Sequence, residues 1–156
     1  MTRARLLLAA FAFAWIGLLA GIAMEAVVRF DAPGLARPVG LSVGKVVFAA
    51  VAGVERVLFA IAVILAFVSR PSRFVRIMLV GIGAVLLLEQ AFLLPVLDAR
   101  ADLYIQGRTP PTSSAHALYL AGEAIKVVLL GATGWTLLRG DRSSPDSRTR
   151  IPIPES

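Results

Sequence analysis

Glutamates placed inside otherwise apolar segments are the residues of this chain best suited to do chemistry. Glu55, Glu89 and Glu123 lie in three different segments, at a similar depth when residues are counted along each expected helix, and Arg56 and Lys126 lie close to two of them. A charged side chain at the centre of a bilayer costs about 2.5–3.5 kcal/mol on insertion scales, so such residues are candidates for function by default. Carboxylates in this setting could bind a proton or a cation, or pair with the nearby basic residues.

Helical spacing groups further polar residues with Glu123. Steps of three, four and three residues place four side chains along one face of a helix, namely His116, Tyr119, Glu123 and Lys126. This predicts a polar stripe that leads from the outer end of the helix toward its middle, with His116 at the entrance. In the second apolar segment, Lys45 and Arg56 share a face, whereas Glu55 is turned away by roughly 100°.

The charge count within the apolar segments is unequal. Three carboxylates face only Arg56 and Lys126, which leaves one carboxylate in surplus and predicts that one of the glutamates is protonated. Three interpretations stay open: interhelical ion pairs that fix the register of the helices, a route or pocket for protons or a small polar species, and a metal site. We expect no metal, because Arg56 and Lys126 would repel an ion held by His116 and the glutamates.

Composition indicates that these segments are membrane helices. The chain is 58% hydrophobic and 17% charged, with a mean hydropathy of +0.80, whereas soluble domains are about 45–50% apolar and about 25% charged. Spanning a bilayer takes roughly 20 apolar residues. We predict an all-α integral membrane four-helix bundle over residues 1–139, with spans at about 6–24, 42–68, 77–97 and 115–138. The third span is expected to end at Pro95, with a loop over 98–114.

Basic residues predict the orientation of the bundle. Nine flank one side of the spans and five the other, and the richer side is normally cytoplasmic. Both termini are therefore expected in the cytoplasm of a multi-pass inner-membrane or plasma-membrane protein. Residues 140–156, rich in Ser, Pro and charge, are expected to form a disordered cytoplasmic tail. The first apolar run is longer than that of a typical secretory signal, which favours a retained first helix.

Several classes of function are excluded by residue type. Without cysteine, and with a single histidine, the chain lacks thiolate sites and multi-histidine metal centres. It has no phosphate-binding glycine loop and no serine–histidine–aspartate triad, so we expect no enzyme and no cofactor. The basic residues flank the spans, which argues against nucleic acid as a partner despite a pI near 11.0. The expected partner is the lipid bilayer; a second copy or a membrane partner protein stays open.

Small residues recur in the first three spans. Gly17 and Gly21 form a GxxxG pattern in the first span, Gly40 and Gly44 repeat it at the start of the second, and Gly81 and Gly83 lie in the third. Small residues allow helices to approach closely in lipid. We expect this pattern to serve packing within the bundle rather than a specific dimer.

A series of short motifs resembles a known family. The motifs are FDAPGLARP, VGLSVGKVVF, VERVLF, LLPVLDAR and SSAHALYLAGE, in that order. They resemble the bacterial four-helix membrane family of unknown function number 4149, which has eukaryotic relatives similar to transmembrane protein 205. The resemblance implies the same fold and seven matching positions: Pro33, Gly44, Phe48, Glu55, Pro95, Arg100 and His116. Lys126 and the Glu89–Gln90 pair depart from the family pattern.

These observations lead to one functional expectation and one alternative. We expect a non-enzymatic membrane module whose polar cavity, in the outer half of the bilayer, binds or conducts protons or a small polar species. Glu55, Glu123 and Lys126 would form its centre, with Arg56 and Glu89 as partners. In the alternative, the chain is a structural or assembly subunit in which the same residues are interhelical ion pairs.

Overall fold

The chain folds as an all-helical bundle. The computed structural model describes residues 3–139, and within them there are helices and connections but no strand. The predicted tail at 140–156 lies outside the described residues. The elements are α1 (Arg3–Val28), the 3₁₀ turn η1 (Arg29–Asp31), α2 (Arg37–Ser69), α3 (Arg73–Leu88), the π turn η2 (Glu89–Leu93), α4 (Leu94–Ile105) and α5 (Ala115–Arg139).

Four helical segments are long and apolar enough to cross a membrane. They cover Arg3–Asp31, Arg37–Ser69, Arg73–Ile105 and Ala115–Arg139. The predicted all-α architecture with four such helices is therefore confirmed, and it is consistent with a multi-pass membrane protein. Each helix also extends beyond its expected apolar run, because polar residues at the ends continue the backbone hydrogen bonding.

The third segment does not end at Pro95, and residues 98–105 are helical rather than part of a loop. Proline lacks an N–H donor, and its ring collides with the carbonyl of the preceding turn of an α-helix. Here the wide π turn over Glu89–Leu93 ends just before Pro95, and the Leu94 N–H bonds to the Glu89 carbonyl five residues earlier. A π turn inserts one extra residue into the helix. The helix accommodates the proline in this way and continues to Ile105.

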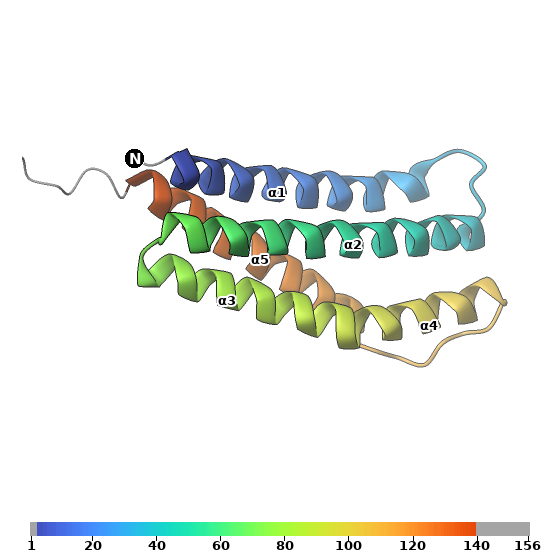
Figure 1. Cartoon of the computed structure of the whole chain (residues 1–156). Coiled ribbons are helices and arrows are strands. Elements are labelled where there is room, and N and C mark those ends of the chain that lie inside the picture. The colour runs from blue at the N-terminus through green and yellow to red at the C-terminus, as the bar shows by residue number, and fades with distance from the viewer. Residues whose placement is uncertain (1–2, 140–156) are drawn as a thin grey trace, which may run out of the picture.

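The four segments run side by side, and the bundle has two distinct ends (Figure 1). The start of α1, the α2–α3 connection and the last turn of α5 lie together at one end, which we call the basic end because it carries Arg5, Arg70, Arg73, Arg76 and Arg139. The α1–α2 connection and the far end of α4 lie at the other end, which we call the cavity end. In the bundle α5 packs against α1 and α3, and α2 packs against α1 and α4.

Local chemistry sets the tight connection at the basic end. Arg70 ends α2 in the left-handed conformation, with φ of 44°, and its N–H bonds to the Ala66 carbonyl. This is the usual geometry of a helix C-terminus. Two residues later, the Ser72 hydroxyl accepts a hydrogen bond from the Val75 N–H and caps α3. The chain thus reverses direction within three residues.

The hydrophobic core occupies the half of the bundle nearest the basic end. On α1 it runs from Leu8 to Trp15 and Leu19, and the remaining members come from the other three segments: Ala62, Val75, Leu79, Ile82, Leu86, Leu130 and Leu137. Every one of these side chains is buried. The half of the bundle nearest the cavity end is packed less completely, and the polar residues lie where the two halves meet.

Glycine has a packing role at only one of the two GxxxG pairs. A Cβ at Gly40 would lie 2.8 Å from Cε1 of Phe30, and one at Gly44 would overlap the Arg29 guanidinium, so the expectation of packing within the bundle is confirmed for this pair. A Cβ added at Gly17 or Gly21 would meet no atom within 4 Å, so the expectation is wrong for that pair. These two residues face the outside of α1. In contrast, a Cβ at Gly83 on α3 would lie 2.6 Å from Cζ of Phe59 on α2. Glycine at position 83 is what lets the Phe59 ring of α2 pack against α3.

We therefore expect Gly83→Ala to destabilise the bundle. The Phe59 ring must move to make room for the methyl group, and overpacking of this kind costs about 1–3 kcal/mol. Thermal unfolding in detergent should show a lower melting temperature than the native chain. Gly17→Ala is the matched control; it should leave the melting temperature unchanged or raise it slightly, because alanine favours helix over glycine. Equal melting temperatures for the two variants would contradict the packing of the Phe59 ring against α3.

Candidate functional site

A buried lysine holds three carboxylates together at the centre of the bundle. The Lys126 Nζ lies 2.7 Å from Glu55 Oε1, 2.7 Å from Glu89 Oε2 and 3.1 Å from Glu123 Oε1. Lys126 is 0% exposed, and Glu55 and Glu89 are each 2% exposed, whereas the Glu123 side chain is 21% exposed. We call these four residues the carboxylate cluster. They link α2, the π turn and α5.

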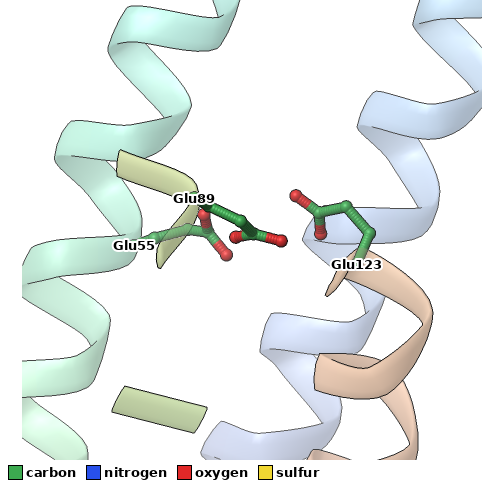
Figure 2. Close-up of side chains that lie close together, drawn as sticks. All are labelled: Glu55, Glu89 and Glu123. Carbon is green, nitrogen blue, oxygen red and sulfur yellow. The ribbon is translucent and has the colours of Figure 1, made fainter. Parts of the chain in front are cut away.

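The three carboxylates reach the cluster from different elements and point toward one another (Figure 2). Glu55 lies in the middle of α2, Glu89 is the first residue of the π turn, and Glu123 lies two turns into α5. One oxygen of each lies within 4.8 Å of the others. The three carboxylates thus lie at a similar depth in the bundle, as counting residues along each helix predicts.

Two further residues shape the cluster. The Trp15 Nε1–H of α1 donates a hydrogen bond to Glu55 Oε1 at 3.2 Å. All four helical segments therefore contribute a side chain to the cluster or its surroundings. Gly122, next to Glu123, provides the space for Glu89: a Cβ at this position would overlap Glu89 Oε1. Any larger residue at position 122 would displace the Glu89 carboxylate.

The charges of the cluster do not balance. One ammonium group faces three carboxylates, and the imbalance is larger than expected from the sequence, because Arg56 lies elsewhere. Three oxygens, Glu89 Oε1, Glu89 Oε2 and Glu123 Oε2, have no hydrogen-bond partner among the described residues, although Glu89 Oε2 is ion-paired with Lys126. Burying like charges together is unfavourable, and so is leaving a buried polar atom unpaired. The cluster therefore has capacity for additional positive charge or for hydrogen-bond donors.

Arg56 is outside the cluster although it follows Glu55 directly. Its side chain is exposed, and its Nη1 donates a hydrogen bond of 2.7 Å to Gln90 Oε1. Gln90 Nε2 in turn donates to the Ala52 carbonyl at 3.2 Å. Consecutive residues of a helix point about 100° apart, so Glu55 and Arg56 cannot both face the interior. The expected role of Arg56 as a direct partner in the cluster is corrected accordingly.

A cavity of about 770 Å³ extends from the cavity end to the cluster. It lies between α1, α2, α4 and α5, and most of its lining is aliphatic or aromatic. Glu123 is the cluster residue that lines it. Tyr119 and His116 line it as well, so the predicted stripe on α5 does lead from an exposed His116 to the buried Lys126.

A hydrogen bond and an ion pair connect the helices around the cavity end. The Arg29 guanidinium pairs with Glu25 one turn earlier, and its Nη1 also donates to the Gly40 carbonyl at the start of α2. Lys45 Nζ on α2 lies 2.5 Å from Asp102 Oδ1 on α4. Both cations line the cavity, and both already have a carboxylate partner.

The positions implied by the family resemblance are spread along this half of the bundle. Pro33 lies in the α1–α2 connection, and a Cβ at Gly44 would overlap the Arg29 guanidinium. The Phe48 ring contacts the Tyr119 ring edge-on, with centroids 5.7 Å apart. Pro95 follows the π turn, and Arg100 donates a hydrogen bond to the Pro111 carbonyl in the α4–α5 connection.

Metal binding does not suit the cluster as it stands. Three carboxylates within 4.8 Å of one another could coordinate a divalent cation. The Lys126 ammonium, however, lies among them and contacts all three. Its positive charge opposes a metal ion at the same place, whereas Arg56 lies outside the cluster and has no part in this.

Comparisons with protein-family models, with curated proteins and with solved structures return no match for this chain. The resemblance to the four-helix family of unknown function therefore stays a prediction.

Sequence reasoning identified all four members of the cluster but not Trp15 or Gly122. Trp15 is buried with its N–H bonded to Glu55. A signal was present: Trp15 lies in the middle of the first apolar run, where an indole N–H needs an acceptor. Gly122 precedes Glu123, but nothing in the sequence indicates that Glu89 packs on it.

We expect Trp15→Phe to weaken the bundle by removing the donor to Glu55 while keeping an aromatic ring in the core. A hydrogen bond to a charged group contributes about 1.5–3 kcal/mol. The free energy of unfolding in mixed micelles should fall by roughly this amount. Trp135→Phe is the matched control, because Trp135 is exposed and its ring lies under the Arg139 guanidinium at the basic end; its effect should stay below about 0.5 kcal/mol. An equal loss in both variants would contradict a role for the indole N–H.

Proposed function

We propose that this protein is a non-enzymatic membrane module that binds an exchangeable proton in its carboxylate cluster. The observation that supports this most directly is the ratio of three carboxylates to one ammonium group around Lys126. Fully ionised, the cluster would hold a net charge of −2 on side chains that are all buried except for the partly exposed Glu123. A bound proton lowers that charge and also supplies a donor for one of the unpaired oxygens.

Interhelical ion pairing alone explains the composition of the cluster less well than a bound proton does. One carboxylate opposite Lys126 would join two helices by an ion pair, and the other two would add only repulsion. The second candidate is a structural or assembly subunit, and a separate observation favours it. Arg56 is exposed on the outside of the bundle at the depth of the cluster, where a membrane partner protein or a second copy would shield it from lipid.

The packing favours binding of the proton over conduction across the membrane. The cavity gives access to Glu123 from one end of the bundle. Between the cluster and the basic end, the interior is filled by the hydrophobic core, with Ile82 and Leu130 among its fully buried members. A proton that enters through the cavity therefore reaches the cluster and returns by the same path while the core stays closed.

The arrangement of the basic residues supports the proposed orientation. The α2–α3 connection, the start of α1 and the end of α5 share the basic end (Figure 1), and the positive-inside rule assigns that end to the cytoplasm. In this orientation the cavity opens on the outer side of an inner or plasma membrane, and the cluster takes up protons from that side.

The bound proton should be visible by infrared spectroscopy. At neutral pH, the native chain should show the C=O stretching band of a protonated carboxyl group, which shifts in D₂O. Among the variants Glu55→Gln, Glu89→Gln and Glu123→Gln, at least one should lose the band. Asp31→Asn, at an exposed position outside the cluster, is the control and should retain it. If the band is absent from the native chain or persists in all three variants, the cluster does not hold a proton.

The orientation can be tested with single cysteines, because the native chain contains none. We expect a membrane-impermeant maleimide to label Thr109→Cys, in the α4–α5 connection, in intact cells. Arg73→Cys, at the basic end, should be labelled only after the cells are permeabilised. Both positions are exposed. The reverse labelling pattern would show that the basic end faces outward.

A further inference from the structure

We propose that the cavity binds an organic cation with a large apolar body, whose positively charged nitrogen or phosphonium centre lies against Glu123. The inference rests on the proposed function, since it assigns a ligand to the same cluster that holds the proton. It commits to one chemical class on the basis of the size of the cavity, the character of its walls and the position of its unpaired charges.

The size and lining suit an apolar body rather than a hydrated ion. A volume of about 770 Å³ lies within the range of about 300–1,000 Å³ that is typical of pockets for small organic molecules. Its walls are formed mainly by aliphatic side chains of α1 and α4 and by Phe48 of α2. A small inorganic ion would lose its hydration shell there without gaining ligands in return.

The charges select a cation. Arg29 and Lys45 line the cavity, but each is already paired with a carboxylate, and Arg29 has a backbone acceptor as well. The carboxylates of the lining are less well matched. Asp98 has no ion-pair partner among the described residues, and Glu123 shares Lys126 with two other carboxylates and has one oxygen unpaired. The surplus charge of the lining is therefore negative.

Aromatic side chains next to Glu123 add to this preference. Tyr119 lies one turn before Glu123 on the same face of α5, and the Phe48 ring contacts it edge-on at an interplanar angle of 83°. The faces of aromatic rings attract cations with a strength of about 0.5–2 kcal/mol. A cation that reaches Glu123 along the cavity passes these two rings.

Proton and organic cation compete for the same negative charge. When the cation reaches Glu123, the cluster no longer needs its proton to limit repulsion, so binding releases the proton to the solvent and the total charge is conserved. The ionisable groups that face Glu123 come from α2, the π turn and α5, and they are Glu55, Glu89, Lys126, Tyr119 and His116. From α1, Trp15 contributes only a neutral donor.

Two hydrophobic ions of nearly equal size and opposite charge provide the test. We expect purified protein in neutral detergent to bind tetraphenylphosphonium by isothermal titration calorimetry, and to bind tetraphenylborate at least about tenfold more weakly, which is a difference of about 1.4 kcal/mol. Repeating the titration in buffers of different ionisation enthalpy counts the protons released for each cation bound.

Variants separate the charge from the shape of the site. Glu123→Gln keeps the shape and removes the charge, and it should weaken binding of the phosphonium at least about tenfold. Asp31→Asn, outside the cavity, should leave binding unchanged. Ala23→Phe, which adds a ring to the cavity wall on α1, should also weaken binding, whereas Ala60→Phe, on an exposed face of α2 outside the cavity, should not.

Each outcome has one meaning for the proposal. Phosphonium binding that depends on Glu123 and Ala23 supports the site, and accompanying proton release links it to the proposed function. Such binding without proton release supports the cation site and argues against the bound proton. Equal affinity for the two ions, or no binding of the phosphonium, overturns the cation site. In that case the protonated-carboxyl band still decides the proposed function independently.

Discussion

The structure depends on one ammonium group shared by three carboxylates. Lys126 is fully buried, and its Nζ contacts Glu55, Glu89 and Glu123 from two neighbouring helical segments and from its own. Removing the ammonium would leave three carboxylates in a medium of low dielectric constant, where an unpaired buried charge costs about 3–5 kcal/mol. The register of the helices follows from this requirement, because a shift of any one of them by a single residue would turn its glutamate out of the cluster.

The cluster divides the bundle into two unlike halves. On one side, large aliphatic side chains fill the interior and fix the helices relative to one another. On the other, the helices enclose a cavity and are joined near its end by the Arg29–Gly40 hydrogen bond and the Lys45–Asp102 ion pair. The packed core and the proposed binding cavity thus lie in different parts of the chain. The packed half supports the cluster, and the open half gives access to it.

Most of the fold could be predicted from the sequence, because long apolar runs and basic flanks follow from the physics of the bilayer. The four residues of the cluster were also found, since depth along a helix can be counted. Three features were not predicted. Arg56 points outward because its neighbour Glu55 takes the interior position, the helix continues through Pro95 because a π turn precedes it, and Trp15 finds its acceptor on a helix that is distant in the sequence.

The π turn at Glu89–Leu93 also restricts insertions and deletions in the third helical segment, Arg73–Ile105. Each residue added to or removed from a helix rotates everything beyond it by about 100°. The extra residue in the π turn therefore determines which face of α4 looks inward, and with it the placement of Leu94, Leu97, Asp98 and Ala101 in the cavity wall. Loss of one residue here would relax the helix to ordinary geometry and turn these side chains away from Glu123. Insertions and deletions between Glu89 and Ala101 should consequently be far less tolerated than in the α4–α5 connection, because that connection is not helical and a change in its length does not rotate a helix.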